Sequence, residues 1–182
     1  MGKIMVHEFI SLDGVFENPS WTADYPFDPK MGEAISSLMG ESGALLLGRK
    51  TFQMFAPAWS TRTAEDDPGA PFMNERTKHV VSSTLDSAEG WQNSTILGPY
   101  NAGAIGDLKG RVHGNIYVSG SGHLVRGMLE DELVDELHLF VYPVALGAGG
   151  RLFVEGDQAR LALAETEAYD SGVVHLAYRP AG

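Results

Sequence analysis

Apolar residues follow two different spacings along the chain, and the two spacings alternate. Residues 44–47 form a continuous apolar run of strand length, which is typical of a strand buried on both faces. Between residues 29 and 39 the apolar positions recur at offsets of 0, 4, 7 and 8, on one face of a helix. The preceding Asp28 and the first helical Pro29 favour a helix start, because Asp accepts hydrogen bonds from free N–H groups and Pro suits that position.

This alternation predicts a single α/β domain over residues 1–182. Strands that alternate with helices indicate a parallel sheet. Segments 161–169 and 173–179 differ, because they flank Asp170-Ser-Gly172, a sequence typical of a hairpin turn. The other expected elements are strands 3–10, 44–47, 79–82, 95–97, 115–118 and 136–142, helices 29–39, 102–108, 123–129 and one around Phe52, and loops 18–29 and 60–71. The sheet is therefore predicted to be mixed, mostly parallel, with an antiparallel C-terminal hairpin.

Composition narrows the function classes. There are 13 Lys and Arg against 24 Asp and Glu, a net charge of −11 that opposes long-range attraction to nucleic acid. The chain has no Cys, which excludes disulfides and thiolate metal sites, and its six His residues are scattered, so we expect no metal. No apolar run approaches the roughly 20 residues of a membrane span, and the first residues resemble no export signal. We therefore expect a cytoplasmic protein that binds neither membrane nor nucleic acid.

A first candidate phosphate site follows the apolar run 44–47. Gly48, Arg49, Lys50 and Thr51 stand where a buried strand passes into a helix. Backbone N–H groups, a hydroxyl group and two cations would converge there, and a helix N-terminus attracts anions. A helix start with solvated basic residues is an equally good reading of this segment taken alone. It is not a P-loop, because the glycine spacing of that motif is absent.

A second glycine-rich turn follows the strand expected at 115–118. Gly120, Ser121 and Gly122 precede the helix that starts near His123 and Leu124, and two glycines allow a backbone to approach a diphosphate closely. The turn is only a partial dinucleotide fingerprint, since a third glycine is missing, and a tight strand-to-helix turn remains an alternative. His123 is a candidate phosphate contact or simply a residue of the helix start.

Hydroxyl groups mark a third strand end. Ser82, Ser83 and Thr84 follow the strand expected at 79–82 and suit a ribose or its phosphate, although such clusters are common in ordinary turns. Open α/β sheets bind ligands at the carboxyl ends of their strands. Three such segments on successive strand ends together indicate an extended nucleotide.

The order of these motifs resembles the dihydrofolate reductase-like family, in particular the branch of the C-terminal reductase domain of the bifunctional riboflavin-biosynthesis deaminase/reductase. The resemblance spans residues 3–178 and rests on segments 11–14, 46–52, 80–85, 119–124, 133–139 and 142–153. It implies a three-layer α/β/α sandwich. It also implies that residues 48–51, 82–84 and 120–124 contact NADPH.

The resemblance implies a reaction as well. The expected activity is NADPH-dependent hydride transfer to a carbonyl or imine of a small polar or heterocyclic substrate, similar to 5-amino-6-(5-phosphoribosylamino)uracil reductase. The signature of the accompanying zinc deaminase is absent from this chain. The position at which dihydrofolate reductases keep a pterin-binding carboxylate falls near Gly32, and Glu33 lies nearly opposite the apolar helix face, so a folate substrate is disfavoured.

Asp13 is the catalytic candidate, because the first strand and its loop border the substrate cleft in the family that this chain resembles. It would orient the substrate or help to deliver a proton; capping of its own Asp-Gly turn is the alternative. A non-catalytic nucleotide-binding module and an interaction domain are the alternative functions. The apolar segment 137–144 suggests a surface for a homodimer.

Overall fold

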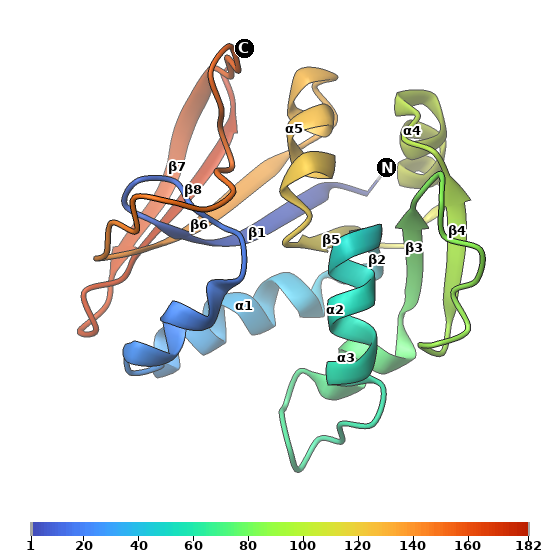
Figure 1. The fold of residues 1–182 in the computed structure, drawn as a ribbon, viewed down its shortest axis with the longest axis horizontal. Helices are drawn as coiled ribbons and strands as arrows, with labels where there is room; N and C mark the ends of the chain where they lie inside the picture. The colour runs from blue at the N-terminus through green and yellow to red at the C-terminus, as the bar shows by residue number, and fades with distance from the viewer. Residues whose placement is uncertain (1, 182) are drawn as a thin grey trace.

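The computed structural model describes residues 2–181, which form one eight-stranded mixed sheet flanked by helices (Figure 1). The strand order is β4-β3-β2-β5-β1-β6-β8-β7, parallel from β4 to β6 and antiparallel in the β6, β8 and β7 ladder. The strands are β1 (Ile4–Ser11), β2 (Ser42–Gly48), β3 (Thr77–Val81), β4 (Ser94–Gly98), β5 (Asn115–Ser119), β6 (Glu136–Tyr142), β7 (Leu161–Ala168) and β8 (Val174–Pro180). The helices are η1 (Pro19–Asp24), α1 (Pro29–Gly40), α2 (Arg49–Trp59), α3 (Ala70–Glu75), α4 (Ala102–Arg111) and α5 (Gly122–Glu130).

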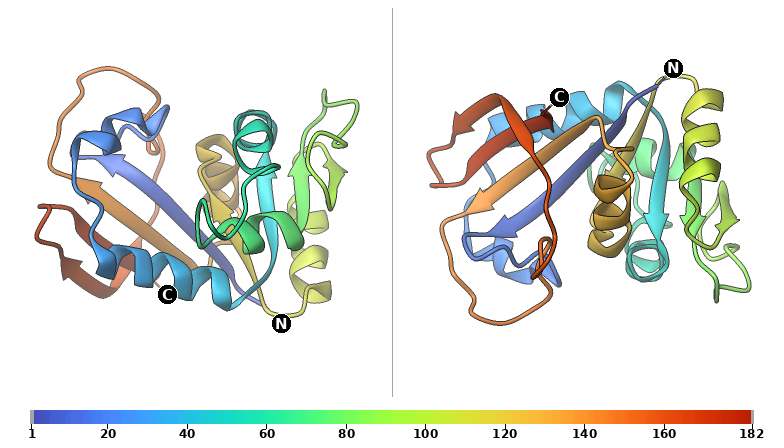
Figure 2. Two further views of the ribbon diagram at one scale, coloured as in Figure 1. Left: turned by 90° about the horizontal axis from the view of Figure 1, so that it is seen from below. Right: turned by 90° about the horizontal axis from the view of Figure 1, so that it is seen from above.

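Helices cover both faces of the sheet, which confirms the predicted three-layer α/β/α class (Figure 2). On one face, Val6 and Ile116 pack with Val125 of α5 in a cluster that α4 also joins. On the other face, Leu45 packs with Phe52 of α2 in a cluster that includes side chains of α1 and α3. Because successive side chains of a strand point to opposite faces, continuous apolar runs such as that of β2 supply both clusters.

The connections change direction at the centre of the sheet. From β1 the chain crosses one face through α1 to reach β2, and from β5 it crosses the other face through α5 to reach β6. The carboxyl ends of β1 and β5 therefore lie side by side where the connections diverge. In open α/β sheets this topological switch point is where ligands bind.

Two short elements were not predicted from the sequence. Residues Pro19–Asp24 form a 3-10 helix inside the predicted loop 18–29, and Ala70–Glu75 form α3, which begins at the end of the predicted loop 60–71. Ala70 and Met73 of α3 are buried against the sheet, so tertiary packing stabilises a helix of only six residues. Such a helix is too short to show the periodicity from which helices are predicted.

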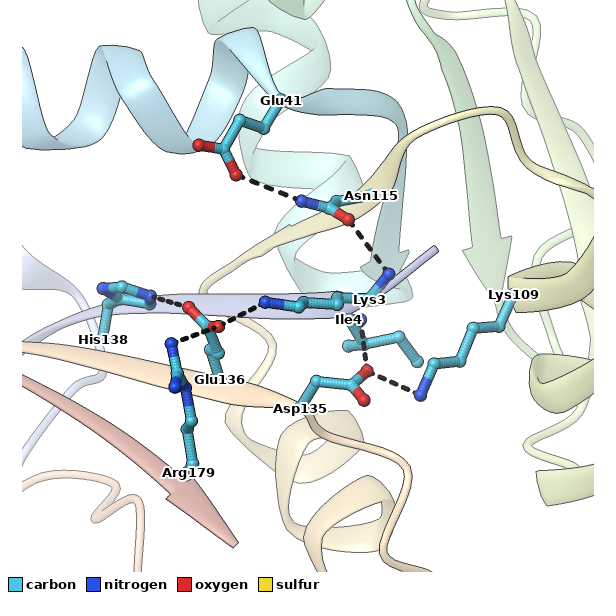
Figure 3. A network of polar contacts seen from close by, with 9 residues as sticks. All are labelled: Lys3, Ile4, Glu41, Lys109, Asn115, Asp135, Glu136, His138 and Arg179. Carbon is cyan, nitrogen blue, oxygen red and sulfur yellow. Dashed lines mark hydrogen bonds and ion pairs between the residues drawn. The ribbon is translucent and has the colours of Figure 1, made fainter. Parts of the chain in front are cut away.

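A polar network ties the amino ends of the central strands together (Figure 3). Glu136 at the start of β6 pairs with the ammonium group of Lys3 at 2.7 Å and with Arg179 of β8 at 3.2 Å. The Asp135 carboxylate accepts from the Ile4 N–H at 2.7 Å. Lys109, Asn115, Glu41 and His138 complete the network. This end of the sheet is opposite the carboxyl ends, so the network lies away from the edge at which open α/β sheets bind ligands.

The segment on which the sequence placed a homodimer surface is internal. Strand β6 pairs with β1 on one side and β8 on the other, and Leu137 and Phe140 are buried. Strand β7 forms the edge instead, and most of its residues are exposed. The surface argument for segment 137–144 is therefore wrong, because apolar character there reflects the core. Among residues 2–181, no helix has the length and apolar character needed to cross a bilayer.

Candidate active site

One large cleft of about 1980 Å³ lies at the carboxyl ends of the parallel strands. Its walls come from both helical layers, with α2 on one side and α5 on the other. All the residues predicted to contact a cofactor line it: Gly48, Arg49, Lys50, Thr51, Ser82, Ser83, Thr84, Gly120, Ser121, Gly122, His123 and Leu124. Three segments up to 76 positions apart in sequence therefore meet at one site, because parallel strands end at the same edge of the sheet.

Hydrogen bonds join these segments to one another. The Ser121 hydroxyl accepts from the Gly48 N–H at 2.9 Å and donates to the Thr51 hydroxyl at 2.9 Å. The Arg49 guanidinium donates to the Thr84 hydroxyl at 2.7 Å. The segments after β2, β3 and β5 thus form a continuous polar wall, which holds a cation beside exposed hydroxyl groups.

The donors along this wall fit an extended dinucleotide phosphate. Helices α2 and α5 both begin at the cleft, and no side chain caps either first turn. Ser121 has the position to cap α5 but contributes its hydroxyl to Gly48 and Thr51 instead. Free N–H groups at two helix N-termini attract anions. Gly120 has φ of 64°, a conformation that glycine adopts without strain, and the Phe16 ring fills the space beside Gly122.

The side chains of two predicted contacts are engaged elsewhere. Leu124 is 6% exposed and packs in the core, so only its backbone faces the wall. The Ser82 hydroxyl accepts from the N–H groups of Thr84 and Leu85, at 3.2 and 2.9 Å, and so closes the turn after β3. Ser83 and Thr84 stay exposed on this turn.

Asp13 does not line the cleft. Its carboxylate accepts from the Ser11 hydroxyl at 2.6 Å and from the N–H groups of Leu146 and Gly147 at 3.0 and 2.8 Å. These hydrogen bonds hold the pKa of Asp13 well below its usual range, and the one from Ser11 has the largest effect. Asp13 thus joins the end of β1 to the loop after β6. Because its donors stabilise the ionised carboxylate, Asp13 is poorly suited to deliver a proton.

Arg126 also lies in the cleft wall. It is 19% exposed in its side chain, and it donates to the carbonyl of Arg151 at 2.9 Å. Its guanidinium also approaches Nδ1 of His123, so the predicted contact His123 is held by this arginine. One further cationic group, the Arg126 guanidinium, therefore stands near the first turn of α5.

The part of the cleft that α1 and α2 border holds polar residues that the sequence did not single out. His7 of β1 and Tyr117 of β5 lie 110 positions apart, and the tyrosine hydroxyl lies 2.6 Å from Nδ1 of His7. The next residue, Glu8, points to the opposite face of the sheet, because strand side chains alternate. Glu8 is 3% exposed, and its Oε1 has no partner among the described residues. A signal was available, because two ionisable residues interrupt the apolar run at 4–10.

Burial changes the titration of both strand residues. It lowers the pKa of His7 to about 3, with His138 and His175 contributing smaller repulsive effects. It raises the pKa of Glu8 to about 8. Both groups are therefore neutral near pH 7, since desolvation disfavours their charged forms.

Helix α1 borders the same part of the cleft. Gly32, Ser36 and Met39 line it, so this helix presents no carboxylate at position 32. Glu33, expected on the far side of the helix, is exposed and lies at the rim. Among residues 2–181, no three His, Asp or Glu side chains gather in a group that could hold a metal ion.

Comparison with known proteins agrees with this architecture. The model of the RibD C-terminal domain family matches residues 2–175. The uncharacterized protein YyaP of Bacillus subtilis is 28% identical over 187 residues, which cover 97% of this chain and 94% of YyaP.

Two solved structures share the fold. A Shewanella sp. PV-4 protein with a provisional riboflavin-biosynthesis name has a TM-score of 0.81 at 21% identity, with both chains covered completely. Dihydrofolate reductase from Enterococcus faecalis, solved with NADP(H), has a TM-score of 0.66 at 15% identity, covering 100% of this chain and 98% of the other. The fold is thus dihydrofolate reductase-like, and because its family model matches nearly the whole length, the chain belongs to the RibD C-terminal domain family.

Proposed function

We propose that this protein is an NADPH-dependent reductase of a small, polar or heterocyclic carbonyl or imine compound. The observation that carries the proposal is the convergence of three strand-end segments on one cleft, with two uncapped helix N-termini and Arg49 among them. This arrangement suits a ligand with several separated phosphate groups better than a single anion. Family membership and the fold shared with a NADP(H)-bound reductase support the same ligand.

Each segment has a part in holding the cofactor. The first turns of α2 and α5 offer backbone N–H groups to the diphosphate, and Thr51 offers its hydroxyl group. Arg49, whose guanidinium donates to Thr84, suits the adenosine 2′-phosphate, the group that distinguishes NADPH from NADH. When bound, NADPH supplies hydride for the acceptor carbon. The chain's own part is to position the acceptor and exclude water.

Isothermal titration calorimetry with NADPH, NADH and NADP⁺ tests the cofactor. We expect NADPH to bind with micromolar affinity, a binding free energy of about −8 kcal/mol. Arg49→Ala should weaken NADPH binding by at least tenfold and change NADH binding little. Gly120→Val should abolish binding of both, because valine is strained at φ of 64° and its side chain would meet Thr51. Arg160→Ala removes an exposed arginine outside the cleft and serves as the control. Absence of binding to all three nucleotides would refute the proposal.

The missing helical carboxylate favours a second candidate, a non-catalytic nucleotide-binding module. NADPH oxidation, followed by absorbance with a panel of carbonyl and imine compounds, separates the two candidates. Tight binding without oxidation by any compound would support the module. Oxidation that depends on Arg49 would support the reductase.

A further inference from the structure

The part of the cleft under α1 and α2, where we place the substrate, has mainly apolar walls. Ile35, Met39, Phe55 and Trp59 line it from these two helices, and the exposed Glu33 and Ser36 of α1 lie at its edge. The buried side-chain hydrogen-bonding groups stand on the central strands, where His7 lies beside Tyr117. The sheet therefore offers a polar substrate of the proposed reductase its buried hydrogen-bonding partners.

His7 and Tyr117 form a hydrogen-bonded pair. Burial raises the pKa of Tyr117, so its hydroxyl keeps its proton. That hydroxyl can donate to Nδ1 of His7, 2.6 Å away. A neutral imidazole that accepts at Nδ1 carries its proton on Nε2. In that arrangement the Nε2–H is a donor of fixed orientation.

The remaining nitrogen of His7 is unused within the protein. Nε2 is buried and has no hydrogen-bond partner among the described residues, although His7 itself lines the cleft. The edges of Phe9 and Phe140 pack on the ring, at centroid distances of 4.7 and 5.1 Å. Native proteins rarely leave a buried donor unpaired, because it costs about 1 to 3 kcal/mol. A ligand acceptor would satisfy it.

We propose that His7, oriented by Tyr117, is a specificity-determining residue that donates from Nε2 to a carbonyl oxygen of a planar, uncharged heterocyclic substrate. The proposal rests on the proposed function, since it assigns the substrate class of that same cleft. The aromatic and aliphatic walls favour a flat ring. A charged ring would be disfavoured, because the buried floor has no charged partner for it, whereas one good donor discriminates strongly for an acceptor.

Isatin, a planar uncharged heterocycle with adjacent carbonyl groups, is a suitable probe, and indole serves as the analogue without carbonyl groups. Ring-nitrogen NMR of protein labelled at histidine reports the His7 tautomer before and during titration, without need for NADPH. We expect the proton on Nε2 in the free protein and a shift of that nitrogen with isatin but not with indole. A proton on Nδ1, or an Nε2 signal that isatin leaves unchanged, would overturn the proposal.

Two variants test the arrangement, with isatin affinity as the readout. Tyr117→Phe keeps the aromatic ring but removes the hydroxyl that orients His7, and His7→Phe removes the donor. Each change should weaken isatin binding by about tenfold, which equals about 1.4 kcal/mol. Tyr169→Phe is the matched control, because it deletes another buried hydroxyl, one that has no partner and lies outside the cleft. Equal isatin affinity in all four proteins would contradict the role of His7.

The NADPH titration separates this inference from the proposed function. Binding of NADPH without binding of isatin would leave the cofactor site supported and overturn the proposed substrate class. Binding of isatin to His7 without binding of NADPH would support His7 recognition and refute the reductase.

Discussion

Replacing Glu8 by Gln should change how the stability of the protein depends on pH. Glu8 is 3% exposed, its Oε1 has no partner among the described residues, and burial raises its pKa to about 8 from 4.5. The folded protein therefore holds a proton that the unfolded chain releases above pH 4.5. The contribution of Glu8 to the stability of wild type is therefore fully present below pH 4.5 and is lost progressively as the pH rises towards 8.

The magnitude follows from the interval between the two pKa values. Each unit corresponds to about 1.4 kcal/mol, so the total loss of stability is about 4 to 5 kcal/mol, of which about 3 kcal/mol has occurred by pH 7. Glutamine cannot ionise and escapes this loss. The free energy of unfolding of Glu8→Gln, relative to wild type, should therefore rise with pH between 4.5 and about 8 and then level off.

Three buried histidines affect wild type in the opposite direction. Burial lowers the pKa of His7, His138 and His175, so their neutral forms stabilise the fold increasingly as the pH rises to 6.5. Wild-type stability alone would therefore mix two trends. These histidines remain in the variant, and their contributions cancel in the difference between the two proteins.

Urea unfolding followed by circular dichroism, at intervals from about pH 4 to about pH 9, measures that difference. Glu89→Gln, which removes one exposed carboxylate, controls for the change in net charge. A difference between Glu8→Gln and wild type that stays flat from pH 5 to pH 8 would refute the reasoning. It would mean that Glu8 ionises in the fold as readily as in the unfolded chain.

Three further changes test the packing and the loop contacts. Gly43→Ala should lower the free energy of unfolding, measured in urea, by about 2 to 4 kcal/mol, because the added Cβ would lie 1.9 Å from the His113 carbonyl oxygen. The control Gly40→Ala has open space around the added Cβ and should be neutral or slightly stabilising. Asp13→Asn should lower the melting temperature most near neutral pH. The difference in melting temperature from wild type should shrink in acid, because the folded state lowers the pKa of Asp13 and its stabilisation is lost as the pH falls. A difference that stays constant with pH would contradict this. Lys78→Met should lower the free energy of unfolding by about 2 kcal/mol in chemical denaturation, because three backbone carbonyl groups lose the ammonium donor that lies 2.8 to 3.2 Å from them. An unchanged denaturation midpoint would show that these carbonyl groups find other partners.

Local patterns were sufficient for most of the secondary structure. The helix that begins after Asp28 starts as expected, with the Asp28 carboxylate accepting from the Lys30 N–H at 2.9 Å. Strand β2 and the C-terminal hairpin also lie where the apolar runs and the turn sequence indicated. These features depend on residues within a few positions of one another, so the chain itself displays their causes.

The cleft could be predicted in outline for a related reason. Each strand-end segment carries its own glycine or hydroxyl signal, and parallel strands bring their carboxyl ends to one edge. The direction of Arg126 and the inward packing of Leu124 could not be predicted, because both lie on the short helix α5, whose spatial neighbours the sequence spacing does not define.

The sequence by itself therefore determined the order and kind of the main elements, the three strand-end segments and the family. Only the tertiary structure decided that Tyr117 reaches His7, that Glu8 is buried without a partner and that Asp13 binds the loop at Leu146. The physical reason is the strand order. Placing β5 and β6 on either side of β1 brings together residues more than 100 positions apart, and no periodicity along the chain records which neighbours a strand receives.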